Sequence, residues 1–240
     1  MKRATFVAAG LALLATAAPA LAQDRPSGER LAGLGSFEIQ TGQYRPRIDS
    51  EFALTPGTPG PWQTTFGTSS RWMFKLHGGK VLFSGYGTLE LGAGVGYTSF
   101  TTHGRFADET SSLEKIGFRL VPLVLDLTYR VDPVWEKFGI PVVPNGRVAL
   151  IRDQWWVTGA GGKTSKSGAT NGWAWGGGLA LVLDFIDPSL ARELDRDSGI
   201  KHTMLVFEAA QTKVDDFGSK SSWDLSNDGL MLTFGFMFAF

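Results

Sequence analysis

The 240-residue chain contains no cysteine, which excludes disulfides, zinc sites with thiolate ligands and thiol catalysis. It also has no excess charge of either sign, with 23 basic and 23 acidic residues. A nucleic-acid binder needs a basic excess for phosphate contacts, so this class is excluded. Beyond the first 22 residues, no apolar run approaches the ~20 residues of a membrane helix. The longest runs, at 120–127 and 179–185, are interrupted by Asp126 and Asp184.

The first 22 residues have the organisation of a secretory signal peptide. Lys2 and Arg3 precede a short apolar stretch at 6–18, and Ala20-Leu21-Ala22 then provides a small-residue cleavage site. We therefore expect residues 1–22 to be removed on export and residues 23–240 to form one domain.

What the rest of the chain has in abundance is apolar residues at every second position. The clearest case is one strand face at the end of the sequence, made of Leu230, Leu232, Phe234, Phe236, Phe238 and Phe240. Period two predicts β-strands. In most such segments the opposite face carries glycine, alanine and isolated charges, which is typical of the interior of a narrow barrel. The apolar face then points to lipid, so the pattern predicts an outer-membrane barrel rather than a soluble one.

Eight strand segments are expected, at 33–44, 70–77, 85–100, 114–130, 145–157, 171–184, 200–213 and 229–240. They predict an all-β fold, an eight-stranded antiparallel transmembrane barrel. An even number returns both mature termini to the periplasm. The connections expected outside the cell are 45–69, 101–113, 158–170 and 214–228.

Two of the periplasmic turns are predicted to contain short helices. Asp132-Pro133 and Asp187-Pro188 each place an N-cap aspartate before a proline, and Gly139 and Gly199 follow as stop signals.

Aromatic residues gather near the ends of the predicted strands, as in the interfacial girdles of membrane proteins. The expected girdle consists of Trp72, Tyr97, Trp155, Trp156, Trp173, Trp175, Tyr129 and Phe240. The closing residues Phe236, Phe238 and Phe240 also resemble the C-terminal signal that the outer-membrane assembly machinery reads.

Alternation further predicts a network of charged side chains in the lumen: Glu38, Lys75, Glu90, Arg119, Asp126, Asp184 and Glu208. The place of Arg119 assumes a shift of phase near Pro122, at a bulge. In the fifth segment either Arg152 or Asp153 must face lipid, and the sequence leaves both open. Since buried charges must pair or be hydrated, the network is expected to plug the lumen, and an ion or solute path is the alternative.

Several stretches resemble the myxobacterial-type outer membrane β-barrel family. They are 35–40, Tyr44-Arg45-Pro46, 66–72, 138–141, Trp155-Trp156, 181–188, His202-Thr203 and Asp215-Asp216-Phe217. The resemblance covers nearly the whole mature chain. It implies an outer-membrane location and a barrel fold, and little about activity.

No catalytic constellation is found, so an enzyme is not expected. His77 lies beside Gly78-Gly79 in an expected turn, and neither His103 nor His202 is followed two residues later by the serine that outer-membrane lipid A deacylases use. No metal-ligand spacing such as H-E-x-x-H occurs, and no cofactor or metal is predicted.

The leading hypothesis is therefore an outer-membrane barrel with a structural or surface-interaction role, carried by its outer loops. A narrow pore or carrier for a small solute is the alternative, followed by an enzyme that modifies envelope lipid. The expected partners are outer-membrane lipid and, during biogenesis, the assembly machinery. No sequence feature identifies a ligand.

Overall fold

The computed structural model describes residues 31, 33–52, 57–105, 111–159, 162–219 and 221–240. The expected signal peptide, residues 1–22, lies outside the described residues, and so does the expected start of the mature domain at residue 23.

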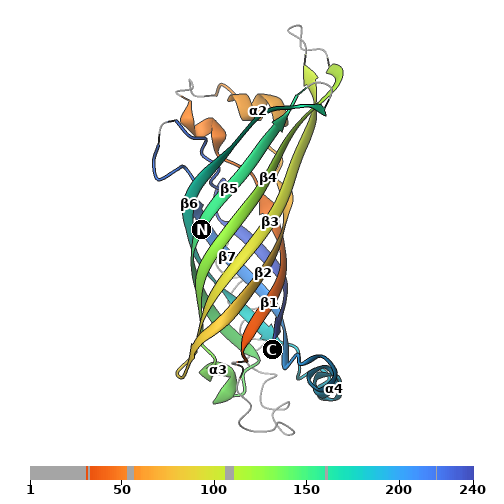
Figure 1. Ribbon diagram of the computed structural model, residues 1–240, viewed down its shortest axis with the longest axis vertical. Helices are drawn as coiled ribbons and strands as arrows, with labels where there is room; N and C mark the ends of the chain where they lie inside the picture. Colours follow the sequence, from red (N-terminus) through yellow and green to blue (C-terminus); the bar gives the residue numbers. More distant parts are fainter. Residues whose placement is uncertain (1–30, 32, 53–56, 106–110, 160–161, 220) are drawn as a thin grey trace.

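Eight antiparallel strands form one closed barrel, in which each strand pairs with its sequence neighbours and the last strand returns to the first (Figure 1). The strands are β1 (Gly35–Tyr44), β2 (Arg71–Ser84), β3 (Thr88–Arg105), β4 (Ser111–Arg130), β5 (Val142–Thr158), β6 (Thr164–Val182), β7 (His202–Lys213) and β8 (Met231–Ala239). The fold predicted from alternation is confirmed. The second strand was predicted too short, because it continues through Gly78 and Gly79 in register with β1.

The helices divide between the two ends of the barrel. The helices α3 (Pro133–Glu136) and α4 (Pro188–Ser198) lie at the end that carries the C-terminus, and α2 (Pro61–Phe66) lies at the opposite end (Figure 1). A short 3-10 helix, η2 (Ile48–Glu51), precedes α2 in the same connection. Both predicted turn helices are therefore present. Within the described part of the chain, no helix has the length and apolar character needed to cross a membrane.

Only one of the two predicted aspartate caps is made. Asp187 accepts hydrogen bonds from the backbone N–H groups of Ser189 and Leu190 at the start of α4, and Gly199 ends the helix in the left-handed conformation, with φ 71°. Asp132 makes no side-chain cap on α3, because its carboxylate accepts the hydroxyl hydrogen of Thr88 instead.

Large apolar side chains form a belt around the outside of the barrel. The belt includes Phe37, Ile39, Phe74, Leu76, Leu91, Val95, Leu125, Leu127, Val148, Leu150, Leu179, Phe207, Leu232, Phe234 and Phe236. A contiguous apolar surface of this kind is unfavourable in water and is satisfied by lipid. The molecule is thus a transmembrane barrel of the outer-membrane type.

Most of the predicted girdle faces outward, but Trp155 does not. Trp72, Tyr97, Trp173 and Trp175 are exposed on the outer surface, and Trp156 is half-buried. Tyr129 and Phe240 are exposed nearer the opposite end of the barrel. Trp155 is only 7% exposed and points inward, so its place in the girdle was wrong. The girdle pattern misplaced it because the lumen near α2 is itself lined by aromatic side chains.

The prediction that Arg119 faces the lumen was wrong for the same reason. Its neighbours Phe118 and Leu120 are buried inside the barrel, and Arg119 is exposed on the outside. Alternation runs unbroken through β4 past Pro122, so the expected shift of phase does not occur. In β5 the open choice is resolved: Asp153 is buried and inward, whereas Arg152 is exposed and donates to the Asn171 side chain at 3.0 Å.

Candidate functional site

The interior of the barrel has three layers, two apolar and one polar. The apolar layer at the α2 end of the barrel, which we call the outer end only as a label, comprises Tyr44, Ile48, Trp62, Met73, Phe100, Phe118, Leu120, Trp155, Val214, Leu225 and Met231. The inner apolar layer comprises Leu31, Val143, Ala180, Val182, Met204, Val206, Met237 and Ala239. Along β5 the order Val143, Arg147, Asp153 and Trp155 shows that the charged residues lie between the two.

Arg147 is the centre of the polar layer, and sequence reasoning missed it. Its Nη2 atom lies 2.9 Å from Glu38 Oε1, and its Nη1 atom lies 3.1 Å from Glu208 Oε2. Its Nε–H donates to Thr128 Oγ1 at 2.8 Å, with Asp126 Oδ1 3.6 Å away. One guanidinium on β5 thereby contacts side chains from β1, β4 and β7. A buried charge of this kind is tolerated because its donors meet carboxylates.

A second ion pair lies beside the first and was also missed. Arg130 Nη2 lies 2.7 Å from Glu90 Oε2, and both side chains are at most 5% exposed. Ser36 Oγ donates to the other oxygen of Glu90 at 2.5 Å. This pair connects the start of β3 and the end of β4 to the start of β1.

His77 belongs to this layer rather than to a turn, which corrects the expectation from sequence. It lies within β2, with its side chain buried. Its Nε2 atom is 2.7 Å from Asp126 Oδ2, and its Nδ1 atom is 3.8 Å from Glu38 Oε2. The two glycines that suggested a turn are strand residues paired with Phe37 and Ser36.

Glycines on the inner face provide the room for these side chains. A Cβ added to Gly79 would lie 1.8 Å from Glu90 Oε1, and one added to Gly92 would lie 2.2 Å from His77 Nε2. Larger residues at either position would displace the polar network. The glycine-rich inner face predicted from alternation therefore has a specific use.

Of the seven charged residues predicted to face the lumen, five lie in the polar layer and two do not. Glu38, Lys75, Glu90, Asp126 and Glu208 are in the polar layer, with only Lys75 more than slightly exposed.

Asp184 lies in the turn after β6, where its Oδ2 atom is 2.5 Å from His202 Nδ1 and its Oδ1 atom accepts from Thr203 N at 3.0 Å. Asp184 is thus part of a separate pair near the end of the barrel, and Arg119 lies outside, as described above. Sequence reasoning omitted Arg130, Arg147 and His77, and left Asp153 undecided. The alternation of Val148 and Leu150 with Arg147 was the signal that could have placed Arg147 inward.

A helix from the first outer connection occupies the mouth of the barrel. Trp62 of α2 is 6% exposed, and its ring centroid lies 4.9 Å from that of Phe100 and 5.1 Å from that of Phe118. Asp49 of η2 holds the start of α2, because its carboxylate accepts from the backbone N–H groups of Trp62 and Gln63. Trp155 and Trp223 stack beside this group, with centroids 4.3 Å apart.

The first and last outer connections are hydrogen-bonded to each other. Tyr44 donates its hydroxyl to Leu225 O at 2.6 Å, and Arg47 N donates to Ser226 O at 3.0 Å. Arg45 N donates to the Asn227 side chain at 2.9 Å. These contacts make one platform of the two connections at the outer end, which we call the outer platform (residues 45–52, 57–68 and 214–219, 221–230).

A small cavity of about 70 Å³ borders the polar layer. Its polar lining consists of Gln40, Lys75, His77, Asp126, Arg147, Glu208 and Thr212. This volume suits a few water molecules or a small ion.

No protein-family model matches the chain, and no curated protein matches it. Membership of the myxobacterial-type outer membrane β-barrel family is therefore not supported, although the small outer-membrane barrel that the resemblance implied is present.

Among solved structures, the chain is similar to two of Ail, the attachment invasion locus protein of Yersinia pestis. The first shares 13% identity over 86% of this chain and 99% of Ail, with a TM-score of 0.42. The second, in complex with the heparin analogue sucrose octasulfate, shares 14% identity over 85% and 99%, with a TM-score of 0.40.

Proposed function

We propose that the protein is a closed outer-membrane barrel whose function resides in its outer platform. The observation that carries the proposal is the occupied interior: Trp62 of α2 packs into the mouth, and ion pairs centred on Arg147 cross the lumen beneath it. An eight-stranded barrel leaves little room beside such side chains. A role in surface interaction or in envelope structure follows, because the outer platform is then the part of the molecule available to partners.

The platform presents an apolar side chain in an unusual way. Phe217 is 67% exposed, and both it and Asp216 adopt positive φ angles, 57° and 54°. Such backbone is costly for residues other than glycine and persists where the surroundings enforce it. Asp216 is held by the side chains of Asn171 and Ser222, which donate to its carboxylate. The turn thereby projects an aromatic ring into solvent, as a contact residue requires.

The proposal also assigns an orientation. The outer platform faces the exterior, and α3, α4 and the C-terminus face the periplasm. Short connections on the periplasmic side are usual for bacterial barrels. Cleavage of intact cells by trypsin after Lys163, in the turn between β5 and β6, or after Lys166, at the exposed start of β6, tests this orientation.

Adherence of bacterial cells tests the function. Cells that produce the full chain are expected to bind epithelial monolayers, or to aggregate with one another, more than cells that lack it. Phe217→Ala should reduce this binding several-fold. Phe138→Ala, which removes a ring 73% exposed at the opposite end, is the matched control and should have no effect. Equal adherence with and without the surface-displayed protein would contradict the proposal.

A narrow pore or carrier is the second candidate, and the cavity beside Lys75 and Glu208 is the observation that favours it. A small ion could reside there if the surrounding ion pairs rearranged. Ion currents through single barrels separate this candidate from the first.

A further inference from the structure

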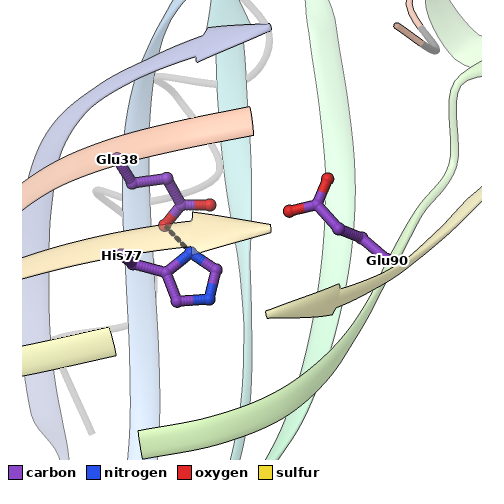
Figure 2. A group of neighbouring side chains, drawn as sticks. All are labelled: Glu38, His77 and Glu90. Carbon is purple, nitrogen blue, oxygen red and sulfur yellow. Dashed lines mark ion pairs between the residues drawn. The ribbon is translucent and has the colours of Figure 1, made fainter. Parts of the chain in front are cut away.

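Three side chains from three successive strands converge inside the barrel. Glu38 comes from β1, His77 from β2 and Glu90 from β3, and Figure 2 shows the Glu38 carboxylate against the imidazole, with the Glu90 carboxylate directed toward the two from across the lumen. One ligand atom from each residue lies within 4.8 Å of the other two, and all three residues are buried. One nitrogen and two carboxylate oxygens in this arrangement are a recognised donor set for a divalent metal ion.

The hydrogen bonding of His77 leaves one ring nitrogen directed at these carboxylates. Its Nε2 atom lies 2.7 Å from Asp126 Oδ2, and an ionised carboxylate only accepts hydrogen bonds, so Nε2 carries the hydrogen. In the neutral imidazole, Nδ1 then carries no hydrogen and presents a lone pair. Nδ1 has no hydrogen-bond partner, and the side chain is 7% exposed. A buried lone pair that faces carboxylates is unfavourable unless a proton or a metal ion lies between them.

We propose that Glu38, His77 and Glu90 bind one divalent transition-metal ion of the Zn²⁺ class within the barrel. Asp126 completes the arrangement, since a metal-binding histidine usually donates its other ring N–H to a carboxylate. This contact fixes the tautomer and orients the ring. The ion joins the first three strands, and its role does not depend on whether the outer platform binds a partner.

The arginines position the carboxylates without using all their oxygen lone pairs. Arg147 and Gln40 contact Glu38, whereas Arg130 and Ser36 contact Glu90. Each carboxylate offers about four lone-pair directions. Two on Glu38 are used by Arg147 and one by Gln40, and two on Glu90 are used by Arg130 and Ser36, so each carboxylate keeps at least one for a metal. With metal–ligand distances of about 2.1 Å in a tetrahedral site, two ligand atoms lie about 3.4 Å apart. The three ligand atoms, now within 4.8 Å of one another, must therefore draw together by up to about 1.4 Å when the ion binds.

The charges of the polar layer also favour a cation. Among the described inward-facing residues around the three ligands, the carboxylates are Glu38, Glu90, Asp126 and Glu208, and the basic groups are Lys75, Arg130 and Arg147. Negative charge exceeds positive charge by one when His77 is neutral. A buried excess of negative charge is unfavourable, so the charge of the layer favours a bound cation.

Zinc titration of the full barrel tests the site. The protein, without a histidine tag, is purified in detergent, stripped with EDTA, and titrated with ZnCl₂ by calorimetry. We expect one ion per barrel. Asp126→Asn should weaken binding 10- to 100-fold, the range for loss of such an outer contact, and His77→Ala should abolish it. His103→Ala removes an exposed histidine of β3 and should leave binding unchanged.

Cobalt provides a readout that needs no variant. Co²⁺ bound to the wild-type barrel should give visible absorption bands of a low-coordinate site and shift the NMR signals of the His77 ring. Absence of one-to-one binding by the wild-type barrel would overturn the proposal. So would zinc binding unchanged in a folded His77→Ala or His77→Gln barrel, or an NMR spectrum in which both His77 nitrogens carry protons in the presence of Zn²⁺.

Discussion

The guanidinium of Arg147 lies 2.9 Å from the carboxylate of Glu38, and this contact joins β5 to β1 across the interior of the barrel. The two strands are not neighbours in the sheet. The same guanidinium also contacts Glu208, so one side chain neutralises carboxylates from two other strands. The barrel is therefore braced through its lumen as well as by the hydrogen bonds of its wall.

Loss of this brace should be costly. Arg147→Met leaves the carboxylates of Glu38 and Glu208 buried without their main partner, and we expect the free energy of unfolding to fall by about 3–5 kcal/mol. Urea unfolding in phospholipid vesicles measures the change. Arg152→Met is the matched control, since Arg152 lies on the same strand but faces outward. Equal effects of the two substitutions would refute the brace.

The packing of α2 at the mouth of the barrel should depend on Trp62. Trp62→Ala removes a buried ring that contacts Phe100 and Phe118, and we expect a loss of about 3–5 kcal/mol and faster proteolysis of the first outer connection. Trp72→Ala removes an exposed tryptophan and should leave proteolysis of that connection unchanged. If both variants resist protease as the wild type does, α2 is not held by its tryptophan.

The outer platform should be sensitive to pH through Glu51. Burial, and then repulsion from Asp224, raises the pKa of Glu51 to about 7 from an unfolded value near 4.5. The folded platform binds this proton more tightly, so the contribution to stability is fully present below about pH 4.5 and is lost as pH rises through about 7.

Hydrogen exchange of the first outer connection, corrected for intrinsic rates, should therefore be slower at pH 5 than at pH 8. Glu51→Gln should remove this difference. A difference of the same size in the variant would mean that another group is responsible.

Assembly should depend on the terminal aromatic residue. Phe240→Ser replaces a ring at the end of β8, and we expect much less folded protein in the outer membrane if the assembly machinery reads this position. Phe138→Ser alters an exposed ring in a turn at the same end and should assemble normally. Folded yield is measured by heat-dependent gel migration. Equal yields would show that Phe240 has no special role.

The barrel itself could be predicted because the bilayer imposes a simple rule on the outer face. Every second residue of β8, from Leu232 to Phe236, faces lipid and must be apolar, and the register of the other strands follows the same period. Helix signals were equally local, since Asp187 and Gly199 mark the ends of α4 by themselves.

The interior was predicted less well because the rule does not govern it. Phe118 and Trp155 point into the lumen, where Trp62 from a distant connection packs on or near them, so apolar character no longer indicates the outside. His77 was misread because the pair Gly78-Gly79 looks like a turn, whereas Gly79 in fact makes room for Glu90 inside the barrel, a use that a local turn signal does not distinguish. The pairing of Arg147 with Glu38 could not be predicted, because β5 and β1 face each other only when the whole sheet has closed.

Single-barrel recording in planar bilayers tests the closed lumen most directly. The account predicts no steady current from the wild-type barrel at 100 mV, with insertion verified by trypsin cleavage near Lys163. The double variant Trp62→Ala and Arg147→Ser should conduct, because it lacks both the tryptophan that fills the mouth and the ion pairs that cross the lumen. A stable, ion-selective conductance from the wild-type barrel would contradict the account and favour the pore.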